Sequence, residues 1–158
     1  MTKPKIMTVY GTRPEAIKVA PVVKALDKDE RFESIPVSTG QHKEMLEQVN
    51  TMFGIQPKHD LGLMKQGQGL NELVSRAIAG LDSIIEEEKP DVIISQGDTS
   101  TAMAAALAGF HRGVKIVHLE AGLRTGDIHS PFPEEANRKL IGQVAELHLA
   151  PTEGSMEN

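Results

Sequence analysis

Residues 91–120 have the sequence DVIISQGDTSTAMAAALAGFHRGVKIVHLE, and this stretch decides the fold class. It begins with an apolar, strand-like run from Asp91 to Gln96 and ends with a second one from Val114 to Leu119. The segment between them, Thr99 to Phe110, has the length of a helix, and its many alanines allow close packing on a sheet. A strand, a helix and another strand in this order predict parallel strands in an α/β fold.

The same alternation of strand and helix patterns extends through the rest of the chain, without an internal repeat. Thr12 and Glu15 have capping-box spacing, which supports a helix start at Pro14. Further strands are expected at Ile6–Tyr10, Ile35–Thr39 and Leu147–Ala150, and further helices at 14–26, 41–53, 70–85 and 134–144. The sequence therefore predicts one parallel sheet covered by helices.

Two segments are predicted to be loops. Residues 56–69 contain three glycines and little periodicity, and residues 121–133 contain two glycines and two prolines. Loops of this length inside a compact domain tend to be functional or mobile.

The composition limits the classes of function. A chain of 158 residues can bury one core, and its net charge of −5 argues against a broad nucleic-acid-binding surface. The absence of cysteine excludes disulfides and thiolate catalysis. No apolar run is long enough to span a membrane, and the run after the N-terminal MTKPK is too short for a secretory signal, so a cytoplasmic protein is expected.

Two carboxylates follow the two strands of the deciding stretch, Asp98 after the first and Glu120 after the second. If these strands are neighbours, their backbones lie about 5 Å apart and the side chains can converge at one edge of the sheet. Crowded carboxylates raise one another's pKa, which suits a general acid or base. Alternatively, Asp98 caps the helix beginning at Thr99 and Glu120 caps a turn. Each acid alone favours this structural role, whereas the pair favours proton transfer.

The segment GTRPEAIK, residues 11–18, is a second candidate site. A glycine turn that enters a helix N-terminus can bind an anion, and Arg13 adds a bidentate phosphate partner, with Lys18 further along the helix. The segment is neither a Walker motif nor G-x-G-x-x-G. An ordinary strand-to-helix turn with a solvated arginine remains the alternative.

Charged residues are dense from Glu120 to Arg138, and such density is typical of a binding loop or of a salt-bridged surface. Arg138 is the candidate substrate-binding residue of this segment. The histidines show no metal-ligand spacing, although His42 and His118 lie near strand ends where they could touch a ligand. Asp98, Glu120 and Glu134 could together hold Mg²⁺, but nothing in the sequence demands it, so no metal site is predicted.

Five motifs in fixed order carry a resemblance to a known family. They are GTRPEAIK (11–18), TGQH (39–42), QGDTST (96–101), HLEAGLRTGD (118–127) and SPFPEEANR (130–138). Together they closely resemble the non-hydrolysing UDP-N-acetylglucosamine 2-epimerases, and the resemblance extends from residue 5 to about residue 153.

This resemblance implies a two-domain protein. Family members have two Rossmann-like domains in the glycosyltransferase-B arrangement, with the active site between them. Residues 1–158 are expected to be the N-terminal domain, with helices on both faces of its sheet. The C-terminal domain, which supplies most contacts to the uridine and diphosphate, is expected to be missing from a truncated chain. Full-length members are usually homodimers, and the helix beginning near Gly69 is either a dimer contact or part of the core.

The resemblance also implies a reaction that uses no metal and no NAD. The enzyme removes the C2 proton of UDP-N-acetylglucosamine, eliminates UDP and re-adds it to give UDP-N-acetylmannosamine. By motif, the catalytic acids match Asp98, Glu120 and Glu134, and Arg13 lies near the diphosphate with Lys18 nearby. A chain of this length alone is expected to be inactive. Two alternatives are a non-catalytic binding domain and a UDP-sugar glycosyltransferase of the same architecture.

Many bacterial members are activated by UDP-N-acetylglucosamine at a second site. Gln41 matches a residue of that site by motif, and the adjacent His42 is a second candidate residue of the same site. Some members carry a basic residue where Gly67 or Gln68 stands here, and Glu44 replaces a glutamine. The resemblance therefore leaves allosteric activation open.

Overall fold

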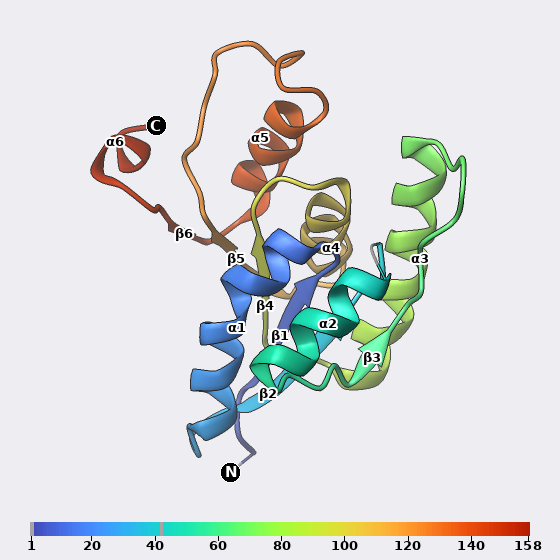
Figure 1. The fold of residues 1–158 in the computed structure, drawn as a ribbon. Helices are drawn as coiled ribbons and strands as arrows, with labels where there is room; N and C mark the ends of the chain where they lie inside the picture. Colours follow the sequence, from blue (N-terminus) through green and yellow to red (C-terminus); the bar gives the residue numbers. More distant parts are fainter. Residues whose placement is uncertain (1, 42) are drawn as a thin grey trace.

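A parallel β-sheet runs through the computed structural model, which describes residues 2–41 and 43–158 (Figure 1). Over these residues the sheet has six strands in the order β3-β2-β1-β4-β5-β6. The strands are β1 (Lys5–Tyr10), β2 (Glu33–Ser38), β3 (His59–Asp60), β4 (Val92–Gln96), β5 (Lys115–Leu119) and β6 (Leu147–Leu149). All their pairings are parallel, so the predicted sheet is confirmed. The order reverses between β1 and β4, and ligands of such sheets bind at the carboxyl ends beside this switch point.

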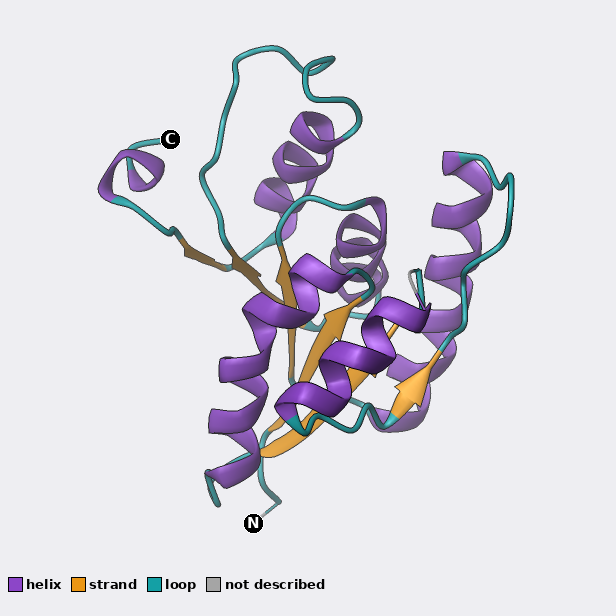
Figure 2. Cartoon of the chain, viewed as in Figure 1, coloured by secondary structure: helices purple, strands orange, loops and turns teal. Residues whose placement is uncertain are grey.

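Helices cover both faces of the sheet (Figure 2). They are α1 (Arg13–Lys28), α2 (Lys43–Phe53), α3 (Leu70–Glu88), α4 (Ser100–His111), α5 (Glu134–Val144) and the short α6 (Glu153–Met156). In Figure 1, α1 and α2 lie on one side of the strands, and α4 and α5 lie on the other. This arrangement follows from the chain direction, because each right-handed crossover places its helix on the side that the strand order dictates.

The first strand is buried on both sides. Met7 and Val9 belong to the core shared with α3, α4 and α5, and Tyr10 belongs to the core shared with α1 and α2. A strand in this position needs apolar residues on both faces, which explains the short continuous apolar run in the sequence.

Helix α4 packs closely on the sheet, as its small residues predict. A Cβ added at Gly109 would lie 2.7 Å from the Cδ1 atoms of both Ile93 and Ile116. The glycine therefore lets the C-terminal part of the helix backbone approach β4 and β5.

The structure differs from the prediction for one of the two loops. Residues 56–69 were expected to form a loop, but they contain β3, which pairs with Val37 and Ser38 of β2. Helix α3 ends at Glu88, and its residues Leu81, Ile84 and Ile85 lie in the core. Among the described residues, no helix is both long enough and apolar enough to cross a membrane.

Candidate active site

Asp98 and Glu120 lie at the same edge of the sheet because their strands are neighbours. β4 and β5 pair through Gln96 and Leu119, the last residue of each strand. The backbone N–H of Gly97 continues this pairing by donating to the carbonyl of Leu119 at 2.9 Å. The two acids therefore stand on adjacent loops, as the sequence predicts.

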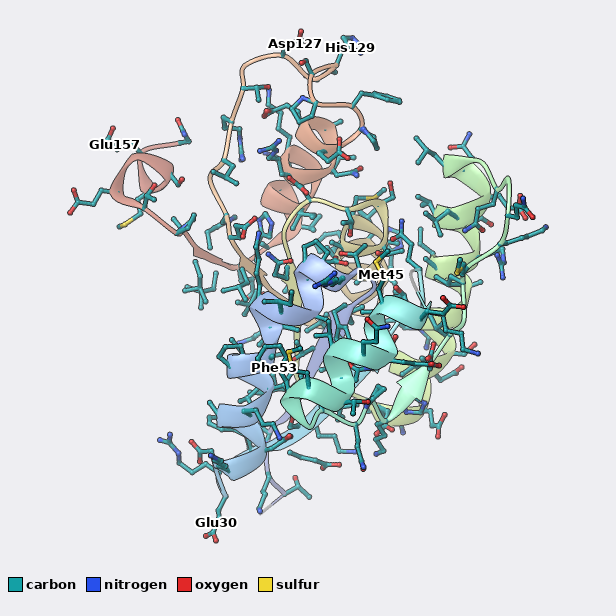
Figure 3. All side chains as sticks on the ribbon, viewed as in Figure 1. Glu30, Met45, Phe53, Asp127, His129 and Glu157 are labelled. Carbon is teal, nitrogen blue, oxygen red and sulfur yellow. The ribbon has the colours of Figure 1, made fainter. Side chains whose placement is uncertain are left out.

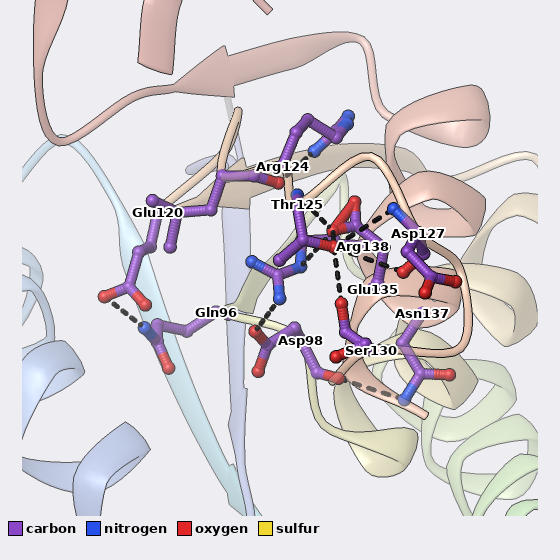
Figure 4. Close-up of polar contacts among 12 residues, drawn as sticks. Gln96, Asp98, Glu120, Arg124, Thr125, Asp127, Ser130, Glu135, Asn137 and Arg138 are labelled. Carbon is purple, nitrogen blue, oxygen red and sulfur yellow. Dashed lines mark hydrogen bonds and ion pairs between the residues drawn. The ribbon is translucent and has the colours of Figure 1, made fainter. Parts of the chain in front are cut away.

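Asp98 is half-buried between its own loop and α5. Its Oδ2 lies 3.7 Å from Nη2 of Arg138, and its backbone carbonyl accepts a hydrogen bond from Nδ2 of Asn137 at 3.0 Å (Figure 4). Burial raises the pKa of Asp98, Arg138 opposes this shift, and the nearby carboxylates of Glu134 and Glu120 add to it. A carboxyl group with a raised pKa can exchange protons closer to neutral pH.

The alternative role for Asp98, capping α4, is wrong. The N-cap residue is Thr99, whose side chain accepts a hydrogen bond from the N–H of Ala102 at 3.1 Å. The carboxylate of Asp98 is therefore not needed for the helix start, and it faces Arg138 instead.

Glu120 binds two side chains and has an unusual backbone. Its Oε2 lies 2.5 Å from Nζ of Lys18. The same oxygen accepts a hydrogen bond from Nε2 of Gln96 at 3.2 Å (Figure 4). Its φ is 67°, in the left-handed region that residues other than glycine rarely adopt. Such outliers often lie at functional sites. The structure thus joins two predicted site residues, Lys18 and Glu120, that come from different segments.

The remaining predicted residues occupy different environments. Glu134 begins α5 and is half-buried, and Arg13 is exposed in the first turn of α1. Gln41 is partly buried, and its Oε1 accepts a hydrogen bond from Oγ1 of Thr101 at 3.2 Å. His42 lies outside the described residues.

The charged segment predicted as a binding loop or a salt-bridged surface divides into two parts. Figure 3 shows Asp127 and His129 at the tip of the loop, and both are exposed. Glu135 and Arg138, in contrast, are buried on α5 beside Asp98. Of these four residues, only Glu135 and Arg138 lie at the candidate site.

No shared metal site forms at the three acids in the described residues. The group whose ligand atoms lie close enough to share an ion is His59, Glu87 and Glu88, and it does not include Asp98, Glu120 or Glu134. Within that group, Glu88 already binds Nζ of Lys58 at 2.8 Å and Nε2 of His59 at 2.7 Å.

One residue beside the site, Glu15, was not predicted from the sequence to take part in it. Glu15 is buried, and its carboxylate accepts hydrogen bonds from the N–H groups of Gly11 and Thr12 and from Oγ1 of Thr99. The capping-box spacing predicts the contact between Glu15 and Thr12, and the structure confirms this capping box. The contact with Thr99 joins the turn after β1 to the turn after β4, and no local pattern reveals it.

The expectation that His118 could touch a ligand is wrong. Its ring is buried with 1% exposure, and its Nε2 lies 2.7 Å from the carbonyl oxygen of Gly97. A carbonyl can only accept, so this nitrogen carries the proton. His118 therefore supports the loop that carries Asp98 from beneath.

His118 predicts a dependence of stability on pH. Burial lowers its pKa below the ordinary value of 6.5, so the folded chain keeps it neutral while the unfolded chain takes up a proton below that pH. The free energy of unfolding should therefore fall on acidification below about pH 6.5, by at most ~1.4 kcal/mol per pH unit from this group. Urea unfolding at pH 5.5 and 7.5 measures the difference, which His118→Gln should reduce. The exposed His111→Gln is the control, and an equal pH difference in all three proteins would contradict this role.

Known proteins resemble the chain over nearly its whole length. The family model described as UDP-N-acetylglucosamine 2-epimerase matches residues 24–158. The UDP-N-acetylglucosamine 2-epimerase of Yersinia pestis is 56% identical over 154 residues, which cover 98% of this chain and 41% of that protein. The chain thus spans about two fifths of the length of such relatives.

Solved structures agree with this match. A crystal structure of UDP-N-acetylglucosamine 2-epimerase superposes with a TM-score of 0.96 at 48% identity, covering 99% of this chain and 44% of the other. The structure of UDP-GlcNAc 2-epimerase from Neisseria meningitidis bound to UDP-GlcNAc gives a TM-score of 0.94 at 46% identity and covers 97% and 41%. The predicted fold class, a Rossmann-like sheet of the glycosyltransferase-B type, is confirmed.

Proposed function

Because the chain belongs to the UDP-N-acetylglucosamine 2-epimerase family, we propose that it carries the acid–base groups of an enzyme interconverting UDP-N-acetylglucosamine and UDP-N-acetylmannosamine. The main support for this function is the arrangement of three carboxylates. Asp98, Glu120 and Glu134 come from three separate segments, and the latter two lie near enough to Asp98 to raise its pKa. A site that only bound a sugar would not need two further carboxylates that act electrostatically on Asp98.

The chemistry of the two sugars explains why such a group is useful. They differ in configuration at C2, so a proton must leave one face of the ring and return to the other. In the proposed reaction, the C2–H electron pair forms a C1–C2 double bond while the C1–O pair leaves with UDP in an anti elimination. UDP then adds again to the resulting 2-acetamidoglucal, and C2 is protonated on the opposite face. Acid–base groups on both faces are therefore required.

Three cations are suited to the departing diphosphate. Arg13 lies in the first turn of α1, where a helix N-terminus favours anions. Lys18 and Arg138 lie beside Glu120 and Asp98 respectively. Each of these two cations faces a carboxylate, and a bound diphosphate would share their charge. Proton transfer and leaving-group departure can thus be linked through the same side chains.

The length of the relatives supports a proposal about a second domain. We propose that residues 1–158 are the N-terminal domain and that a second domain supplies the uridine contacts, since the chain spans 41% of the Yersinia pestis protein. We also propose that the full-length protein is a homodimer with α3 at its interface. We further propose a second nucleotide-sugar site that includes Gln41. The Neisseria meningitidis relative, solved with UDP-GlcNAc bound, supports this choice of substrate.

Isotope exchange tests the function. The full-length enzyme that contains this chain, incubated with UDP-N-acetylglucosamine in D₂O, should form UDP-N-acetylmannosamine with deuterium at C2, as read by proton NMR. Residues 1–158 alone should give no measurable conversion, because the groups that bind uridine would be absent. Release of UDP with complete retention of the C2 proton would instead indicate a glycosyltransferase or hydrolase. Substrate binding without turnover by the full-length protein would indicate a binding domain.

A further inference from the structure

A fully buried carboxylate, Glu135, lies in the first turn of α5 beside the candidate catalytic acids. Its exposed fraction is 0%. A buried charge is costly unless it is paired and hydrogen-bonded. Its Oε2 accepts hydrogen bonds from the backbone N–H of Thr125 at 2.6 Å and from Oγ1 of the same residue at 2.7 Å (Figure 4). Glu135 therefore ties the loop before α5 to the helix itself.

The same oxygen of Glu135 faces Arg138, one helical turn further along α5. Nε of Arg138 lies 4.0 Å from Oε2 of Glu135, and Nη2 of Arg138 lies 3.7 Å from Oδ2 of Asp98. The Arg138 side chain is only 9% exposed. One buried guanidinium thus stands between two carboxylates that belong to different segments of the chain.

We propose that Glu135 acts on Asp98 through Arg138: its carboxylate faces the Nε side of the buried guanidinium and shares the positive charge that Nη2 presents to Asp98. Thr125 anchors Glu135 from the loop, so the contact connects this loop, α5 and the loop after β4. The catalytic consequence rests on the proposed epimerase function. The electrostatic consequence for Asp98 does not.

Several charges act on Asp98, and Glu135 acts through one of them. Arg138 and Glu134 face Asp98 from α5, Glu120 faces it from the end of β5, and Lys18 faces it from α1. Hydrogen bonds from Thr125 lower the pKa of Glu135, so this residue is an anion at neutral pH. Its negative charge offsets part of the positive charge of Arg138. If the charge of Glu135 is removed, the full charge of Arg138 acts on Asp98 and its pKa falls.

Carbon-13 NMR titration of the Asp98 carboxyl in the chain of residues 1–158 tests this, with Asp98→Asn to assign the signal. Glu135→Gln keeps the shape of the side chain but removes its charge, and it should lower the pKa of Asp98 by roughly half a unit or more. Glu135→Asp keeps the charge and should restore most of the shift. The control is Glu86→Gln, because Glu86 also lies near an arginine, with its Oε2 3.6 Å from Nη2 of Arg112.

An unchanged Asp98 titration in a folded Glu135→Gln protein, or a shift no larger than in the Glu86→Gln control, would overturn the proposal. If Glu135→Gln does not fold, Arg138→Gln provides the second measurement. It removes the guanidinium and should raise the pKa of Asp98, and an unchanged value there also overturns the proposal. This titration needs no substrate. A confirmed shift together with an inactive full-length enzyme would refute the epimerase function and leave the electrostatic role of Glu135 intact.

Discussion

Replacing Glu120 by glutamine in the full-length protein is expected to lower kcat for the proposed epimerisation by about 10²–10⁴-fold, the usual contribution of a general acid or base. Glutamine keeps the size of the side chain but cannot exchange the C2 proton. It also loses the charge that pairs with Lys18 at 2.5 Å. Both solvent deuterium incorporation at C2 and net epimerisation should therefore collapse together.

A matched control separates this effect from a general loss of charge. Glu30 lies at the far end of the molecule from the loop that carries Asp127 (Figure 3), and Glu30→Gln should leave kcat unchanged. The fold of Glu120→Gln can be checked by its unfolding transition. Deuterium exchange within about threefold of the parent enzyme would remove Glu120 from the acid–base group.

Replacing Glu15 by alanine is expected to reduce the free energy of unfolding by about 3–5 kcal/mol. The change removes the acceptor for three donors, the N–H groups of Gly11 at 3.0 Å and Thr12 at 2.7 Å and Oγ1 of Thr99 at 2.8 Å. A buried donor without a partner costs about 1–3 kcal/mol, and the sum is a large share of the stability of a domain. For a chain of this size, Tm should fall by roughly 10 °C.

Urea unfolding of Glu15→Ala and Glu15→Gln distinguishes the hydrogen bonds from the volume of the side chain. Glutamine keeps one acceptor oxygen, so its loss should be clearly smaller than that of alanine. Glu44→Ala, on the exposed face of α2, should change stability by less than about 0.5 kcal/mol. A loss below about 1 kcal/mol for Glu15→Ala would show that these donors find other partners.

The sequence predicts most of the fold because its signals are long and local. Helix α5 begins and ends at the predicted residues, Glu134 and Val144, and its first turn is acidic. Strand β3 was missed because two residues, His59 and Asp60, are too few to show any period. Their strand conformation depends on pairing with β2, which is a tertiary contact and leaves no local pattern.

The site could be predicted only where it depends on strand order. Asp98 and Glu120 converge because β4 and β5 are neighbours, and a strand–helix–strand segment implies this pairing. The contact of Asp98 with Arg138 depends on how α5 packs against α4, which no residue pattern specifies. His118 was misjudged for a related reason. Its place near a strand end suggested access to a ligand, but its ring lies beneath the loop and binds the carbonyl of Gly97.

At position 120, with its left-handed backbone, the residue that favours activity differs from the residue that favours thermal stability. A non-glycine residue at φ 67° carries a cost of roughly 1–3 kcal/mol, which glycine would not carry. A library of variants screened only for survival at high temperature should therefore enrich glycine at position 120 and lose the carboxylate. A screen that also demands turnover should retain glutamate, and the difference between the two libraries would measure how much stability this position gives up for function.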